Sequence, residues 1–249
     1  MEKESLPKKE TEQKPVPKPD PGPDPKPDPK PAPETEKKPA ETEKPPQKET
    51  ESEKVVSGIP LAKLTAKGKK GLKLSWLKVD GADGYDIFFA ECGKNEKAVY
   101  KNVKTVNGNS VFSCMITGLK AKNAYKAYVR VFVIKNGIRK YVGTSPSVHA
   151  FTSGSTKKYT NAKSVKVKKK KVTVKKGKTY KIKATVKKLK KKKKLMPKKH
   201  TPKLRYLSTD SSIATVSKKG KIKGIKAGTC YVYVLAHNGV SKKITVTVK

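Results

Sequence analysis

Short runs of alternating apolar and polar residues occupy the chain from residue 56 to residue 153. The runs at 72–76 (LKLSW) and 85–89 (YDIFF) have this pattern, and a run at 125–133 places Tyr, Ala and three Val on one face. A period of two residues is that of a half-buried β-strand. The pair 136–137 (NG) between two such runs predicts a tight hairpin, because both positions of a type I′ turn need positive φ. About seven short strands without a helical period predict an antiparallel β-sandwich.

A second set of alternating runs fills residues 160–249. The run at 180–186 (YKIKATV) alternates apolar residues with Lys and Thr, and the run at 244–248 (ITVTV) closes the region. We therefore predict an all-β protein with two tandem Ig-like/fibronectin-like antiparallel β-sandwiches, at 56–153 and 160–249, after a disordered Pro-rich N-terminal stalk.

The stalk comprises residues 1–55, where proline is dense and aromatic residues are absent. Residues 1–54 hold 14 of the 18 prolines, and proline occupies every second position from Pro15 to Pro33. Proline fixes φ and donates no backbone hydrogen bond, so neither a helix nor a sheet is expected. We predict a disordered Pro/Glu/Lys-rich linker that extends ~3.1 Å per residue where proline is densest. A ligand for proline-reading domains is the alternative, because Pro-x-x-Pro spacings occur.

The first folded region resembles bacterial fibronectin type III domains. The resemblance is carried by LKLSW at 72–76, by GADGYDI at 81–87 and by ITGL at 116–119, followed by Tyr125. It implies that Trp76 is the core tryptophan, and that Leu119 and Tyr125 form a corner in which the Tyr hydroxyl bonds back to the backbone. It implies a fold rather than a function, because such domains serve as spacers, adhesion modules and appendages of carbohydrate-active enzymes.

The second folded region resembles the bacterial immunoglobulin-like domain of group 2. The resembling segments are STDSSIATVS at 208–217, GKIKG at 220–224, AGTCYV at 227–232 and the closing strand at 244–248. The sequence departs from that family in its lysine content and in an insertion at 187–203, where a short loop is usual. The two resemblances imply an extracellular or cell-surface protein of a Gram-positive bacterium, although no signal peptide is visible in this chain.

Charge is concentrated in the last part of the chain. The net charge is −2 over residues 1–54, +12 over 55–154 and +31 over 155–249, where Asp210 is the only acidic residue. Such a field attracts polyanions, and lysine suits sequence-blind contact with phosphate or other anions. Tyr231 and Tyr233 are expected to face away from the core beside this basic face, where they either stack on a ligand or merely cover the sheet. The candidate polyanion-binding residues are Lys168, Lys169, Lys170, Lys171, Lys187, Lys188, Lys190, Lys191, Lys192, Lys193 and Lys194.

The sequence gives little support for catalysis, a cofactor or a metal. Cys114 and Cys230 share strand faces with apolar residues, so each is expected in a core, and a Cys92–Cys114 bridge is the alternative. No histidine lies beside a Cys, Ser or carboxylate at a spacing that indicates a nucleophile and its base. A weak calcium site at the aspartates of residues 80–86 is the alternative reading of a turn that is ordinary in the fibronectin family. We predict that the protein is not an enzyme and needs neither a cofactor nor a metal.

These observations lead to a non-enzymatic structural or adhesion module whose Lys-rich domain docks on an anionic polymer. Wall teichoic acid, glycosaminoglycan or mucin, and DNA are the candidate polymers, nucleic acid only nonspecifically because Arg is scarce. One alternative is a secreted effector whose first domain engages a host surface protein. Another is an accessory region of a larger surface enzyme. We expect a monomer without a membrane span, because no run of about 18 apolar residues occurs.

Overall fold

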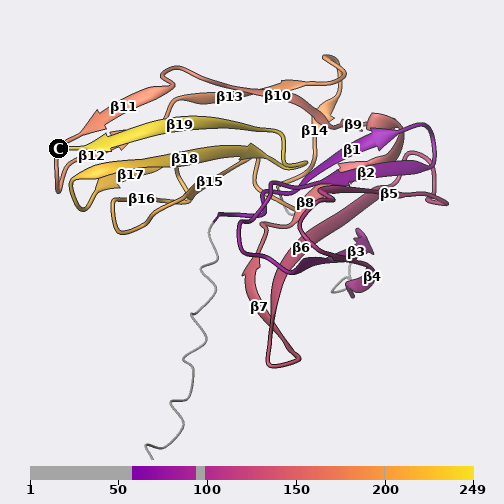
Figure 1. Ribbon diagram of the computed structural model, residues 1–249. Helices are drawn as coiled ribbons and strands as arrows, with labels where there is room; N and C mark the ends of the chain where they lie inside the picture. Colours follow the sequence, from indigo (N-terminus) through magenta and orange to yellow (C-terminus); the bar gives the residue numbers. More distant parts are fainter. Residues whose placement is uncertain (1–57, 94–98, 199) are drawn as a thin grey trace, which may run out of the picture. The chain divides into compact units, whose positions relative to one another are not determined.

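The computed structural model describes residues 58–93, 99–198 and 200–249 and shows an all-β protein, as the sequence predicts (Figure 1). The predicted linker at 1–55 lies outside the described residues. The first part of the chain contains β1 (Lys63–Lys67), β2 (Gly71–Ser75), β3 (Gly84–Glu91), β4 (Lys101–Asn107), β5 (Ser113–Ile116), β6 (Ala124–Lys135), β7 (Ile138–Thr144), β8 (Val148–Phe151) and a 3₁₀ turn, η1 (Thr152–Gly154).

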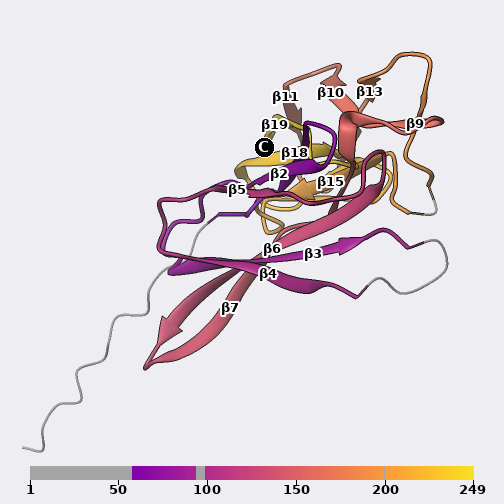
Figure 2. The same cartoon turned by 90° about the vertical axis from the view of Figure 1, so that its right-hand side faces the viewer.

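Two sheets enclose the core of the first sandwich. Strands β1, β2 and β5 form one antiparallel sheet, and the other has the order β4-β3-β6-β7, with β8 also paired to β6. Figure 2 shows the second sheet, from which the β6–β7 hairpin extends. The side chains of Leu64, Leu74, Ile87 and Val129 have no exposed surface, because alternate residues of both sheets point inward. The first sandwich therefore packs three strands on five. Two antiparallel sheets that pack face to face are the architecture that fibronectin type III domains share with immunoglobulin domains.

Local contacts explain why the ends of these strands lie where they do. The backbone N–H of Lys120 donates to the hydroxyl of Tyr125 at 2.9 Å, so this Tyr fixes the corner before β6. Between β6 and β7, φ is 52° at Asn136 and 72° at Gly137. Both values are positive, as in a type I′ turn, and the predicted hairpin is therefore confirmed.

The second part of the chain contains eleven of the described strands. They are β9 (Tyr159–Thr160), β10 (Ala162–Val167), β11 (Lys171–Val174), β12 (Thr179–Lys181), β13 (Ala184–Lys188), β14 (Lys194–Leu195), β15 (Leu204–Ser208), β16 (Ala214–Val216), β17 (Lys221–Gly224), β18 (Gly228–Ala236) and β19 (Ser241–Val248).

Four small sheets make up this second sandwich. The largest has the order β11-β19-β18-β15, and a three-stranded sheet has the order β12-β17-β16. Strands β10 and β13 form a separate two-stranded ribbon, and β14, which lies in the insertion at 187–203, pairs in parallel with β9. Val232, Val234 and Val246 from the largest sheet are fully buried, together with Ile222 from the smaller one.

The run at 180–186 is two strands, where the sequence pattern indicates one. The backbone N–H of Ile182 donates to the carbonyl of Gly220, which ends the pairing of β12 with β17. The carbonyl of Lys183 accepts from Lys168, and the chain then pairs with β10 as β13. The alternation of apolar and polar residues continues across the break, because both strands place alternate residues on the same core.

The two sandwiches form one compact unit with direct backbone contacts. The N–H of Leu64 donates to the carbonyl of Asn238 at 2.9 Å, and the N–H of His149 donates to the carbonyl of His237 at 2.8 Å. A Cβ at Gly239, where φ is +83°, would lie only 2.0 Å from the carbonyl oxygen of Ala62. Only glycine therefore fits the turn that follows β18.

Candidate polyanion-binding surface

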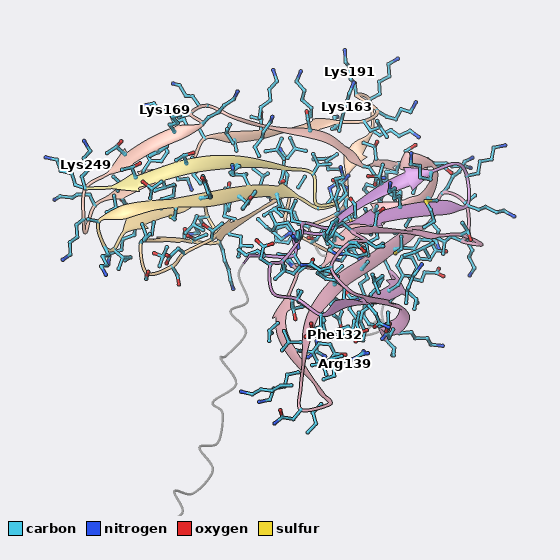
Figure 3. The ribbon with its side chains drawn as sticks, viewed as in Figure 1. Phe132, Arg139, Lys163, Lys169, Lys191 and Lys249 are labelled. Carbon is cyan, nitrogen blue, oxygen red and sulfur yellow. The ribbon has the colours of Figure 1, made fainter. Side chains whose placement is uncertain are left out.

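The β10–β13 ribbon carries lysines along its exposed side. Val165 is buried and Val167 is half-buried, whereas Lys163 and Lys166 are exposed. Figure 3 shows Lys163 and Lys169 on β10 and just after it, and Lys191 after β13, with all three side chains directed away from the core. Because the ribbon is only two strands wide, cations from both strands lie close together.

The candidate lysines fall into two groups at opposite ends of this ribbon. Lys168–Lys171 connect β10 to β11, whereas Lys187 and Lys188 end β13 and residues 190–194 follow it. Lys188 is opposite Ala162, the first residue of β10, while Lys168 lies past the last. A strand rises about 3.3 Å per residue, so roughly 20 Å separates the two groups. The structure therefore does not bring all the candidate lysines together.

Lys163 and Lys166 also belong to this basic surface, although the sequence pattern did not single them out. The nearby ammonium of Lys166, together with the charge of Lys163, lowers the pKa of Lys187 below its usual range. Like charges thus crowd this part of the ribbon, where an anion would relieve their repulsion. Alternation about Val165 places Lys166 on the outer face, but Lys163 is exposed through a register shift between Ala162 and Ser164, which the sequence does not reveal.

A shallow groove of about 490 Å³ runs along this end of the ribbon. Its wall combines ammonium groups from both strands with an apolar strip that includes Leu189, a side chain with 43% of its surface exposed. The residues that line it are Lys163, Ser164, Val186, Lys187, Lys188, Leu189 and Lys191. The groove thus offers four cations and no acid to a ligand.

Two charged side chains of this domain have structural roles. The ammonium of Lys193 donates to the hydroxyl of Ser155 at 3.3 Å and to the carbonyl of Thr156, so it holds the connection before β9. The carboxylate of Asp210 accepts from the backbone N–H of Ser212 at 2.8 Å and from the Ser212 hydroxyl at 2.6 Å. These bonds lower the pKa of Asp210 and fix a turn. The only acid of the domain therefore does not neutralise the groove.

Tyr231 and Tyr233 lie on the outer face of β18, and Cys230 and Val232 point into the core. Tyr231 has 40% of its surface exposed, and the ammonium of Lys243 lies 4.1 Å from its ring centroid. Tyr233 is half-buried. This face therefore combines an aromatic ring with a cation beside it.

The residues assigned to the cores lie there in the structure. Trp76, Cys114 and Tyr125 are buried in the first sandwich, where Leu119 packs against the core while partly exposed. Cys230 is buried in the second sandwich. All three cysteines are free thiols, so the alternative of a Cys92–Cys114 bridge is not seen.

The fold places a thiol beside an imidazole that is 57 residues away in the sequence. The sulfur of Cys92 lies 3.7 Å from Nδ1 of His149, a juxtaposition that sequence spacing did not indicate. Burial raises the pKa of Cys92 to about 11 and, with the charges of Arg205 and Lys126, lowers the pKa of His149 to about 3. Both groups are neutral near pH 7, so the pair lacks the thiolate that a cysteine nucleophile needs.

The three aspartates of residues 80–86 bind different partners. Asp80 pairs with Lys78 at 3.3 Å, and Asp83 accepts from the backbone of Ile134. Asp86, a residue of β3, is buried and accepts hydrogen bonds from Arg139 of β7. Among the described residues, no group of three potential ligands converges on one point, and the alternative of a calcium site has no geometric support.

The second sandwich is similar to a known family of domains. Residues 161–248 match the model of the bacterial Ig-like domain (group 2). No curated protein matches the chain. Over the part that the structure describes, no helix is long and apolar enough to cross a membrane.

Solved structures that are similar to part of this chain include fibronectin type III domains. The third such domain of the human KIAA0343 protein has 17% identity and a TM-score of 0.31, and covers 41% of this chain and 86% of its own. The FN5 domain of Drosophila Lar has 21% identity and a TM-score of 0.28, and the match covers 39% of this chain and 96% of that domain. FN3tt has 19% identity and a TM-score of 0.25, and the match covers 36% of this chain and 80% of FN3tt.

The assignment of the first sandwich follows from its strand order and core, and that of the second from the family match. Domains of both kinds are typical of surface or structural modules, and bacterial Ig-like domains of group 2 occur in bacterial surface proteins. Residues 161–248 therefore match the bacterial Ig-like domain of group 2, and the sandwich before them has a fibronectin type III-like architecture, the arrangement that the sequence predicts.

Proposed function

We propose that this protein is a non-enzymatic surface or secreted module of a Gram-positive bacterium whose second sandwich docks on an anionic polymer. The groove on the β10–β13 ribbon carries the proposal, because it places Lys163, Lys187, Lys188 and Lys191 around one hollow. Wall teichoic acid, glycosaminoglycan or mucin, and DNA all present the repeated negative charge that such a groove attracts.

Simple electrostatics supports a polymer rather than a single ion as the ligand. The second domain carries a net charge of +31 over residues 155–249, so its field concentrates any polyanion near the surface. Lysine ammonium groups on flexible stems make contacts that depend little on ligand sequence or shape. Binding is then expected to be nonspecific, with Kd of ~10⁻⁴–10⁻⁶ M at physiological salt and a steep dependence on salt.

Binding of the full chain to teichoic acid, heparin and duplex DNA, measured by calorimetry at 50 and 200 mM salt, tests this proposal. Four phosphate contacts predict a loss of ~10²-fold in affinity for DNA between these salt concentrations. A variant with Lys163, Lys187, Lys188 and Lys191 all changed to Gln should bind more weakly and show a shallower salt dependence.

The matched control changes Lys218, Lys219, Lys221 and Lys223 to Gln. These residues are exposed on or beside β17, outside the groove, and their loss lowers the net charge by the same amount. The proposal predicts a larger loss of affinity for the groove variant than for this control. Equal losses would mean that binding follows net charge alone, and no binding at 50 mM salt would refute polyanion docking.

A second candidate function is the engagement of a host surface protein by the first sandwich. It is supported by exposed apolar side chains on the β6–β7 hairpin, of which Ile138 has 67% and Ile134 has 54% of its surface exposed. This second function would be favoured by a host protein that binds the variant of the four groove lysines with unchanged affinity but binds the Ile138→Asp variant more weakly.

A further inference from the structure

A cleft lies where the two sandwiches meet. Its volume is about 680 Å³, within the ~300–1,000 Å³ of ordinary ligand pockets. It is bounded by β1 and the end of β2 on one side and by β10, β18 and β19 on the other. The lining residues are Leu61, Lys63, Ser75, Trp76, Leu77, Lys163, Lys170, Tyr233, Gly239, Val240, Ser241, Lys242 and Lys243.

This lining differs from that of the ribbon groove in having an aromatic and aliphatic wall. Trp76 and Leu77 come from the first sandwich and Tyr233 from the second. Five lysines and two serine hydroxyls complete the wall, and it includes no Asp, Glu, Asn or Gln. The cleft therefore offers apolar surface together with hydrogen-bond donors and positive charge.

One polar group in this wall has no protein partner. The indole Nε1–H of Trp76 is buried and makes no hydrogen bond within the described part of the chain. Buried donors of this kind in native proteins are nearly always satisfied by a protein group or an ordered water. A residue that lines the cleft thus carries a buried donor that no described protein group satisfies.

The cleft and the groove share a residue. Lys163 lines both hollows, so a path of cations runs from Lys191 through Lys187 and Lys163 to Lys63 and Lys242. An anionic polysaccharide that lies in the groove can follow this path into the cleft. One part of the polymer would then contact cations alone, and another part would contact cations and aromatic rings.

We propose that the cleft is a subsite for one anionic sugar ring of a polysaccharide, a uronic acid or a sulfated sugar; this inference rests on the polyanion docking proposed above. A pyranose ring has an apolar face that packs on an aromatic side chain, as Tyr233 offers, while its carboxylate or sulfate accepts from lysine. The edge of a nucleobase presents donors as well as acceptors, and the side chains of the cleft supply few acceptors for those donors.

The single tryptophan of the chain provides a direct readout, because Trp76 lines the cleft. A heparin hexasaccharide should change the Trp76 fluorescence of the full chain in a saturable way. A polyphosphate of equal charge should bind, as measured by calorimetry, with little change in this emission. A polyphosphate that changes the emission as much as the hexasaccharide does would contradict a sugar subsite.

Two pairs of variants locate the sugar. Lys63→Gln with Lys242→Gln removes two charges from the cleft, and Lys67→Gln with Lys221→Gln removes two exposed charges elsewhere, one from each sandwich. Tyr233→Leu removes the aromatic wall, and Tyr231→Leu removes a ring from the same face of β18 that does not line the cleft. Each cleft variant should lose about tenfold in hexasaccharide affinity relative to its control.

The outcomes separate this inference from the proposed function. If hexasaccharide and polyphosphate both bind but each cleft variant matches its control, the cleft is not the subsite and polyanion docking stands. If neither the hexasaccharide, nor the polyphosphate, nor DNA binds at 50 mM salt, both proposals fail.

Discussion

The carboxylate of Asp86 is fully buried, and three side chains of the first sandwich donate hydrogen bonds to it. Arg139 donates to both of its oxygens, at 3.1 and 2.9 Å, and the hydroxyls of Tyr141 and Thr105 each donate at 2.6 Å. The guanidinium of Arg139 also lies over the ring of Phe132, and Figure 3 shows these two side chains side by side. One buried charge thus ties β4 and β7 to β3.

Asp86→Asn should destabilise the first sandwich by roughly 1–3 kcal/mol at pH 7, because Arg139 keeps its charge without a charged partner. Burial raises the pKa of Asp86, but the hydrogen bonds from Thr105 and Tyr141 and the charge of Arg139 outweigh burial, so this pKa lies below its usual value of 3.8. The stability that the ionised carboxylate adds to the fold is therefore fully present above about pH 4, and it is lost as pH falls through the pKa of Asp86 in the folded state.

Urea unfolding followed by Trp76 fluorescence at pH 7 and pH 2.5 measures this contribution. The difference between wild type and Asp86→Asn should shrink at the lower pH. Asp80→Asn, at an exposed ion pair, serves as the control and should change stability by less than about 1 kcal/mol. A constant difference at both pH values would show that the charge of Asp86 is not the cause.

Strand β3 begins at Gly84 because atoms of β4 and β6 occupy the space that a side chain at this position would need. A Cβ at Gly84 would lie 2.3 Å from Cζ of Phe132 and 2.4 Å from the carbonyl oxygen of Val106. Phe132, which is fully buried although it belongs to the outer face of β6, covers this glycine. The ring thereby replaces the missing side chain across the strand pair.

Gly84→Ala should destabilise the first sandwich by about 1–3 kcal/mol or more, because the backbone of β4 and the Phe132 ring would both have to move. Gly143→Ala is the matched control on the same sheet, since its Cβ would make only an ordinary contact of 3.5 Å with Val131. Urea unfolding with Trp76 fluorescence should show a loss for the first variant and little change for the second. Similar midpoints for both would contradict the close packing at Gly84.

The strands of both sandwiches were predictable because side chains alternate across a sheet with a fixed period of two. The break between β12 and β13 was not, since Ile182 and Val186 face the same core on either side of it. At the site, the lysine runs were visible in the sequence, but their separation and the inclusion of Lys163 depend on strand pairing and on a register shift. The cleft depends on residues from both sandwiches, which no local pattern relates.

For the whole molecule, the junction between the sandwiches is a set of buried polar groups. Arg205 donates to the carbonyl of Ser147, and its Nε and Nη2 are buried without a partner among the described residues. Burial and the charge of Arg205 lower the pKa of His237 to about 4, as they lower that of His149 to about 3. Two neutral imidazoles therefore share the junction with a buried cation.

Acid should destabilise the folded chain through these histidines. Their pKa values are lowered from 6.5 on folding, so their contribution is complete above pH 6.5 and is lost as pH falls toward 4 and 3. At pH 5 each histidine should lower the free energy of unfolding by about 2 kcal/mol relative to pH 7.5, because pH 5 lies 1.5 units below the pKa of 6.5 in the unfolded chain.

Urea midpoints at pH 7.5 and pH 5.0 test the effect, with His149→Gln and His237→Gln as variants that cannot take up the proton. Each variant should flatten the dependence on pH even if it lowers stability overall. The Asp86 carboxylate stays ionised over this range, so it does not contribute to the difference. Equal midpoints of the wild type at the two pH values would contradict the role of the histidines.

The pairing of β11 with β19 has a mechanical consequence. These two strands run parallel, with Lys171 opposite Thr245 and Val174 opposite Val248, although one lies near the start of the second domain and the other at its end. A pull on the chain from both sides of this domain therefore draws the two strands along each other. The hydrogen bonds between them bear the load in shear and must rupture together, whereas those of a hairpin pulled from its open end separate one at a time. The second domain is therefore expected to resist a pull along the chain better than a domain whose terminal strands form a hairpin.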